Sequence, residues 1–123
     1  MKAPGLDTLP DQDLVTCFAA AAREMGLAVL DSETRRANKM YDRMTAIDAV
    51  LRSRGRAARM ALVPLLDHDD RLIRYFAAKK LLGLMPERAR AEIEWNTKYR
   101  FDAIAGDAKG LLRAFDSGQY APD

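Results

Sequence analysis

Residues 62–83 read LVPLLDHDDRLIRYFAAKKLLG, and this stretch decides the fold of the 123-residue chain. It holds two apolar series at helical spacing, and the polar turn DHDD separates them. The first series is Leu62, Leu65 and Leu66, and the second is Leu72, Ile73, Phe76, Ala77, Lys80, Leu81 and Leu84. The short acidic side chains of the turn suit the exposed amides that open a helix, and Gly83 and Pro86 end the second helix. The stretch therefore predicts a pair of antiparallel helices.

The rest of the chain predicts four more helices and no strand, because apolar residues recur at helical spacing and alternating patterns are absent. The expected helices cover residues 10–27, 31–54, 86–95 and 107–116. A loose connection is expected over residues 96–106, and Gly118 is expected to supply a left-handed cap after the last helix. The last helix is expected to bury three apolar side chains, which are Leu111, Leu112 and Phe115.

Six helices make about three antiparallel pairs, which is the least that closes a core when a lone pair cannot cover its own apolar stripe. A chain of this length forms one domain that can bury a modest core without disulfides or metals. We therefore predict an all-α fold, a short stack of about three antiparallel helix pairs. The domain is expected over residues 10–123, after an N-terminal tail over residues 1–9.

The middle helix pair is similar to the HEAT repeat, an armadillo-type helical repeat. The resemblance rests on Leu62, Leu65, Leu66, Asp67, Ile73, Arg74, Ala77, Ala78, Leu81 and Gly83. It implies that Asp67 and Arg74 join a ladder of polar contacts between successive helix pairs. Over residues 10–123 the chain also resembles a small bacterial HEAT-like family known as a domain of unknown function, through NKMYDRMTAIDAVLRSRG, ALVPLLDHDD, PERAR and the ending GDA to APD. That family implies a fold and no catalytic residues.

The sequence offers no recognisable catalytic or metal-binding constellation. His68 is the single histidine and Cys17 the single cysteine, and no motif joins them as nucleophile and base. Cys17 lies on an apolar helical face, which favours burial over reactivity. The DHDD turn at residues 67–70 is a poor cation site, because consecutive residues of a tight turn point in different directions. We therefore expect no enzyme, no cofactor and no bound metal.

Charge is uneven along the chain, although the net charge is only +2. Residues 35–59 hold two acidic side chains, Asp42 and Asp48, both expected at the surface. The basic side chains of the segment are Arg35, Arg36, Lys39, Arg43, Arg52, Arg54, Arg56 and Arg59. Such a segment would attract phosphates, which keeps a nucleic-acid-binding module open as an alternative. A solvated helix face is the preferred interpretation, because four of the cations lie at or past a helix end and no exposed aromatics interleave them.

Aromatic residues near the end of the fifth helix pose a second open question. If Trp95, Tyr99 and Phe101 are partly exposed, they form an anchor cluster for a partner protein. If they are buried, they close the end of the stack, and burial is the favoured alternative, with Trp95 facing inward. Tyr41 is expected in the core, because it has helical spacing to Met44 and other apolar residues.

A helical stack supplies a surface for contact, so the sequence predicts a non-enzymatic protein-binding adaptor or scaffold. Its partner is expected to dock on the second, fourth and sixth helices, and the residues assigned to partner binding are Arg43, Arg71, Arg74, Trp95 and Tyr99. An immunity protein that neutralises a cognate toxin is the alternative. No signal-peptide pattern and no run of eighteen apolar residues occurs. We therefore expect a cytoplasmic protein that does not bind membranes.

Overall fold

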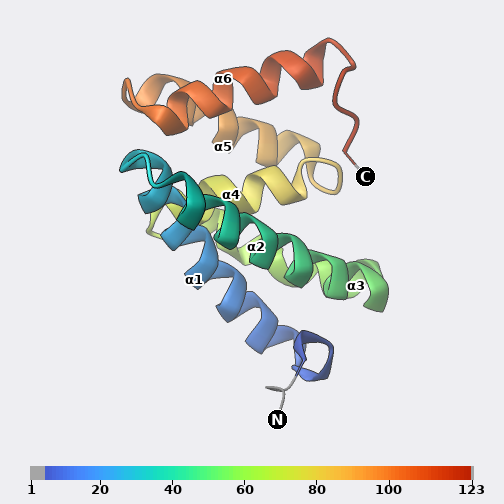
Figure 1. The fold of residues 1–123 in the computed structure, drawn as a ribbon. Coiled ribbons are helices and arrows are strands. Elements are labelled where there is room, and N and C mark those ends of the chain that lie inside the picture. Colours follow the sequence, from blue (N-terminus) through green and yellow to red (C-terminus); the bar gives the residue numbers. More distant parts are fainter. Residues whose placement is uncertain (1–4, 123) are drawn as a thin grey trace.

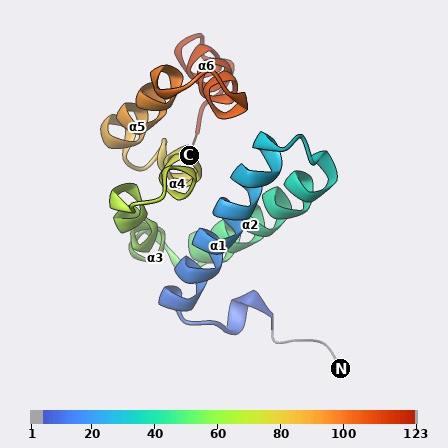
Figure 2. The ribbon, with the colours of Figure 1, turned by 90° about the vertical axis from the view of Figure 1, so that its left-hand side faces the viewer.

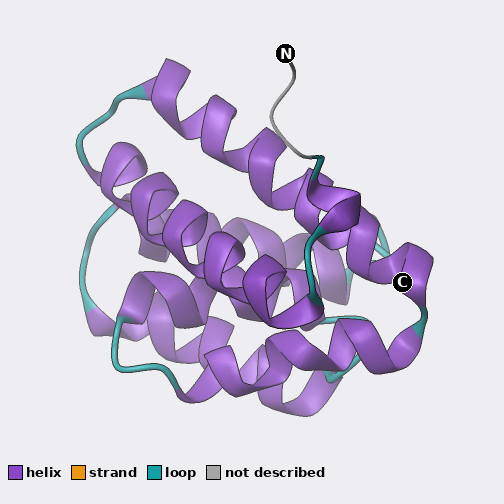
Figure 3. Cartoon of the chain, turned by 90° about the horizontal axis from the view of Figure 1, so that it is seen from below, coloured by secondary structure: helices purple, strands orange, loops and turns teal. Residues whose placement is uncertain are grey.

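The computed structural model describes residues 5–122, and over that range the protein is helical, with six α-helices, two 3-10 helices and no strand (Figures 1 and 3). The elements, in chain order, are η1 (Leu6–Thr8), α1 (Asp11–Leu30), α2 (Thr34–Arg54), α3 (Arg56–Arg59), η2 (Met60–Asp67), α4 (Arg71–Leu81), α5 (Pro86–Tyr99) and α6 (Ala103–Asp116). The α-helices pack largely in sequential antiparallel pairs, which confirms the predicted all-α class. Each of the described helices is too short or too polar to span a bilayer.

Helix α4 lies at the centre of the molecule, between the α1/α2 pair and the α5/α6 pair (Figure 2). It contacts α1, η2 and α5, and seven of its eleven residues are buried. Gly26 of α1 makes the approach to α4 possible, because a β-carbon at that position would lie 2.7 Å from Leu72 Cδ2. A single core therefore runs from α1 through α4 to α6.

The middle helix pair forms around the predicted turn. Asp70 caps α4, since its Oδ1 accepts the Leu72 amide at 2.8 Å. The helix before the turn is tighter than expected, with the single α-turn α3 followed by the 3-10 helix η2. Pro64 lies inside η2 and lacks the amide that a regular α-helix needs. The three leucines of the first apolar series are nevertheless buried.

The connection between α5 and α6 is shorter than the sequence indicated. Helix α5 continues to Tyr99 and α6 already begins at Ala103, so the loose segment predicted over residues 96–106 is wrong. The reason is Asp102, which has an extended backbone and accepts the Ala105 amide at 2.9 Å as an N-cap. The left-handed cap predicted after α6 is confirmed, because Gly118 has a φ of 80°.

Several burial predictions also need correction. Asp48 is buried, with 5% of its surface exposed, whereas the sequence placed it at the surface. Its Oδ2 accepts Arg52 Nε at 2.8 Å one helical turn away, and this ion pair allows a carboxylate to be buried. Cys17 is half-buried rather than buried. The apolar residues of α6, Leu111, Leu112 and Phe115, are half-buried too, because α6 packs mainly on α5.

Candidate docking surfaces

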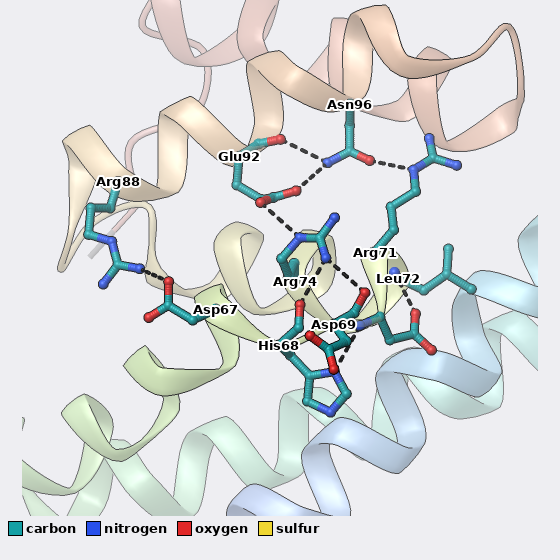
Figure 4. Close-up of polar contacts among 10 residues, drawn as sticks. Asp67, His68, Asp69, Arg71, Leu72, Arg74, Arg88, Glu92 and Asn96 are labelled. Atoms are coloured by element: carbon teal, nitrogen blue, oxygen red, sulfur yellow. Dashed lines mark hydrogen bonds and ion pairs between the residues drawn. The ribbon is translucent and has the colours of Figure 1, made fainter.

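Arg74 of α4 connects the turn before α4 to helix α5 (Figure 4). Its Nε donates to Glu92 Oε1 at 3.2 Å. Its Nη1 donates to the carbonyl oxygens of His68 at 2.8 Å and Asp69 at 3.0 Å. Two of the three guanidinium nitrogens, Nε and Nη1, are therefore engaged within the chain.

Two further groups of polar contacts flank those of Arg74. We call the three groups together the polar seam, which joins η2 and α4 to α5. At one end Arg88 donates to Asp67 at 2.8 Å. At the other end Arg71 donates to Asn96 Oδ1 at 2.7 Å and to both carboxylate oxygens of Asp102 at 2.7 and 3.2 Å. The hydrogen bonds from Arg71 hold the pKa of Asp102 below its usual value. Both Asp67 and Arg74 thus take part in contacts between one helix pair and the next.

Trp95 and Tyr99 of α5 lie over the seam and are exposed, and Phe101 after α5 is exposed too. The favoured prediction that the three aromatic residues are buried is therefore wrong. Trp95 and Tyr99 are 42% and 44% exposed, and their rings stack with centroids 4.4 Å apart. The Arg71 guanidinium lies 4.8 Å from the Tyr99 centroid, and that of Arg74 lies 5.4 Å from the Trp95 centroid. We call these four residues the aromatic seam. Four of the five predicted partner-binding residues therefore come together.

The fifth, Arg43, lies elsewhere, in a shallow hollow between α1 and α2 beside Lys39 and Glu24. The basic segment 35–59 around it is partly neutralised. Its ion pairs are Arg36 with Glu33, Arg52 with Asp48, and Arg54 with Asp11. Arg35, Lys39 and Arg43 remain exposed on successive turns of α2, and they form a narrow basic stripe rather than a broad patch.

A groove of about 220 Å³ opens between α2, α4 and α6. Its lining residues are Met25, Tyr41, Met44, Phe76, Lys79, Lys80, Leu111 and Tyr120. The side chains of Met44 and Phe76 are almost fully covered and form the floor. Tyr41 and Tyr120 stand at the rim, 48% and 39% exposed. The three helices predicted to carry docking thus line one hollow, and we call it the α2/α4/α6 groove.

Tyr41 was expected in the core, and its position at the groove rim is a correction. Its spacing to Met44 is helical, but the apolar stripe of α2 is wider than the cover that α1 provides. Tyr41 therefore lies at the stripe's edge, with Lys80 Nζ 5.2 Å from its ring centroid. The result is an aromatic side chain held at a surface by a neighbouring cation.

The two lysines of the groove differ in their partners. Lys79 Nζ lies 2.8 Å from Asp107, whose Oδ2 also accepts the hydroxyl of the buried Tyr75 at 2.5 Å. Burial, together with the Asp107 charge, raises the pKa of Tyr75. Lys80 donates to Thr45 Oγ1 at 3.3 Å and has no carboxylate partner among the described residues. The groove therefore carries one cation whose charge nothing nearby balances.

The residues considered as catalytic or metal-binding candidates do not lie together in the structure. His68 is exposed in the turn before α4, and its Nδ1 accepts the Asp70 amide at 3.0 Å. Cys17 packs against the core from α1. Over residues 5–122 no three His, Cys, Asp or Glu side chains gather as metal ligands would. What this surface offers is contact area and charge.

Sequence reasoning assigned none of the groove residues to partner binding. One signal was available, because Lys80 occupies an apolar position of the second helical series, one turn after Phe76. A cation on an apolar face indicates the edge of a buried stripe. Tyr120 reaches the groove because the chain reverses after α6, where Gly118 has a φ of 80° and the Tyr120 amide donates to the Ala114 carbonyl oxygen at 3.0 Å.

Comparisons with known proteins give a family and a fold. A sequence model of the family described as Domain of unknown function (DUF2019) matches residues 12–116. The crystal structure of the protein RPA1889 from Rhodopseudomonas palustris CGA009 is similar with a TM-score of 0.87 and 30% sequence identity, covering 98% of this chain and 100% of that chain. No curated protein matches the sequence.

Proposed function

The chain belongs to the DUF2019 family, and we propose that it is a non-enzymatic protein-binding adaptor or scaffold whose partner docks in the α2/α4/α6 groove. The observation that carries the proposal is the groove itself, an apolar floor with an unbalanced cation, Lys80, at its rim. Burying a complementary segment on such a surface is favourable, because apolar surface is removed from water.

We also infer that the helix pairs are units of a short HEAT-like stack. The polar seam supports this, because Asp67 and Arg74 contact Arg88 and Glu92 of the next helix pair. The central helix α4, covered on both sides, supports it as well. In a stack of this kind each unit buries the apolar face of its neighbour, and the exposed edges remain available for binding.

The size of the groove indicates what kind of group it takes. Pockets for cofactors and drug-sized ligands have volumes of about 300–1,000 Å³, and this groove has about 220 Å³. It suits a large apolar side chain of a partner segment better than a free small molecule. Lys80 favours a carboxylate next to that side chain, because an opposite charge there gains a partner that the chain itself does not supply.

The two other candidate functions fit the surface differently. An immunity protein would use the same groove with a toxin as its partner, so it is a special case of the proposal. Nucleic-acid binding would rely on segment 35–59, where Arg36, Arg52 and Arg54 already pair with carboxylates. Three exposed cations on α2 and Arg56 on α3 offer few phosphate contacts, and we therefore prefer the protein partner.

Affinity purification of the full chain from its host, with quantitative mass spectrometry, tests the proposal. The test variant combines Tyr41→Ala with Lys80→Glu, and the matched control is Lys98→Glu, an exposed lysine of α5 outside the groove. We expect one stoichiometric protein partner with the wild type and the control, and at least a roughly tenfold loss with the test variant, since a hot-spot pair contributes about 1.4 kcal/mol or more. Retention of every captured partner by the test variant, or no partner under gentle conditions, would refute the proposal.

A further inference from the structure

The loop between α5 and α6 presents Phe101 to solvent. Its side chain is 101% exposed, more than any other large apolar residue described. The backbone around it is extended, with φ of −152° at Arg100 and −141° at Asp102. Asp102 is fixed by the Ala105 amide and by both terminal nitrogens of Arg71. The ring of Phe101 is thus held out on a short and well-anchored segment.

This exposed ring contributes nothing to the core. Burying a phenylalanine side chain gains about 1.5–3 kcal/mol relative to leaving it in water. The folded chain does not gain this free energy at Phe101, because the ring stays in water. A partner that buries the ring would gain it. Because the backbone is anchored on both sides, a partner would spend little free energy on ordering the loop.

The surroundings of Phe101 are aromatic and basic. Lys109 Nζ lies 5.5 Å from its ring centroid. Arg100 lies 5.0 Å from the Tyr99 ring centroid and donates weakly to the Tyr99 hydroxyl at 3.4 Å. Among the described residues neither cation has a carboxylate partner. The carboxylate of Asp102, which follows Phe101 in the chain, is already engaged by Arg71. We call Tyr99, Arg100, Phe101 and Lys109 the Phe101 corner.

We propose that the Phe101 corner is a second docking site, separate from the groove, and that it binds an acidic protein surface. Phe101 enters an apolar socket of the partner, while Arg100 and Lys109 face carboxylates at the rim of that socket. The adjoining Trp95 and Tyr99 add ring edges, and aromatic and arginine side chains are the residues that dominate binding energy in protein interfaces.

The position of Lys109 separates this site from the groove. Asp107 and Leu111 of α6 face the groove side, and Lys109 lies two residues from each. Two residues along an α-helix correspond to a rotation of about 200°. Lys109 therefore lies on the far side of α6, and a partner at the Phe101 corner does not cover the groove.

Other occupants fit the corner less well. A nucleic-acid base would have only the Phe101 ring to stack on, because Trp95 stacks on Tyr99 and two guanidinium groups lie over that ring. Two unpaired cations beside it offer few phosphate contacts. An anionic membrane is typically bound by clusters of about four to eight basic residues, and the corner has two unpaired cations. A second copy that docked through its groove would place the lysines of that groove opposite Arg100.

Site-specific photocrosslinking of the full chain in its host tests the proposal. The probe p-benzoylphenylalanine is incorporated in place of Phe101, and in place of the exposed Ala91 of α5 as a control. We expect one discrete protein adduct at Phe101 that the control lacks, with the crosslinked peptide carrying aspartate or glutamate beside apolar residues. Phe101→Ala should leave the unfolding midpoint unchanged, which shows that the ring has no structural role.

Charge reversal separates this site from the groove. Combining Arg100→Glu with Lys109→Glu in the probe-bearing chain should lower the adduct yield at least fivefold, and reversing the partner's carboxylates to lysine should restore it. Combining Tyr41→Ala with Lys80→Glu should leave the yield unchanged, so failure of the groove proposal does not affect this result. An adduct with lipid, nucleic acid or a second copy, a yield insensitive to charge reversal, or no adduct above the control would overturn the proposal.

Discussion

Replacing Arg71 with methionine tests whether the polar seam holds α5 and α6 onto α4. Arg71 donates to Asn96, which is fully buried, and to Asp102 at the start of α6. The side chains of Arg71 and Asp102 are only 13% and 18% exposed. Methionine keeps the length of the aliphatic stem and removes the three hydrogen bonds, so the substitution isolates the polar contribution.

The expected loss of unfolding free energy follows from the Asp102 carboxylate, which is left without its partner. Removing one partner of a buried ion pair costs about 3–5 kcal/mol, because the other charge stays uncompensated. Asp102 keeps its bond to the Ala105 amide and some access to water. We therefore expect a loss near the lower end, about 3 kcal/mol at neutral pH. For a chain of this length that corresponds to a fall of about 10 °C in the unfolding midpoint.

Urea unfolding followed by far-UV circular dichroism measures this loss. The matched control is Arg88→Met, which removes another ion pair of the polar seam, where the side chains of Arg88 and Asp67 are 45% and 74% exposed. Exposed pairs contribute little, so the control should lose less than about 1 kcal/mol. If the two variants lose the same amount, the seam does not hold the helices together as we argue.

The pH dependence gives an independent check. Hydrogen bonds from Arg71 lower the pKa of Asp102 in the folded state, while an aspartate in the unfolded chain titrates near about 3.9. The stabilisation is therefore complete above the unfolded value and is lost as the pH falls through the folded value. The difference in unfolding free energy between wild type and Arg71→Met should shrink below about pH 4. A difference that stays constant in acid would refute the assigned cause.

Three substitutions extend the argument to packing. Gly26→Ala should destabilise the fold by about 1–3 kcal/mol in urea unfolding, because its β-carbon would lie 2.7 Å from Leu72 Cδ2. Gly106→Ala, which meets nothing within 4 Å, should stabilise α6 by about 0.5–1 kcal/mol in the same assay. Tyr75→Phe removes the bond to Asp107 and should cost about 1.5 kcal/mol, measured as a lower unfolding midpoint.

The sequence predicts the central helix pair well because its signals are local. The apolar spacing in residues 62–83 fixes which faces are buried, and Asp70 supplies the cap that starts α4. Asp102 gives the same kind of signal at the start of α6. The sequence nevertheless led us to expect a loose connection over residues 96–106 and a last helix that begins at residue 107.

Exposure at the edges of a helix stripe depends on tertiary structure and is harder to predict. Periodicity shows which side of α2 and α5 is apolar, but not how much of that side the neighbouring helices cover. Tyr41 and Trp95 lie at such edges and are exposed. Asp48 shows the reverse case, since Arg52 one turn later neutralises it within a buried setting. That pairing is visible in the sequence as an i, i+4 spacing.

Both proposed docking sites depend on the central helix. The groove includes Phe76 and Lys80 of α4, and the polar seam beside the Phe101 corner includes Arg71 of the same helix. Because α4 is largely buried and is held at both ends, it is a rigid support for both sites. Two partners bound on opposite sides of α6 should then bind independently, with free energies that add. Coupling between the sites would instead require two arrangements of α4, and the continuous packing around it argues against a second one.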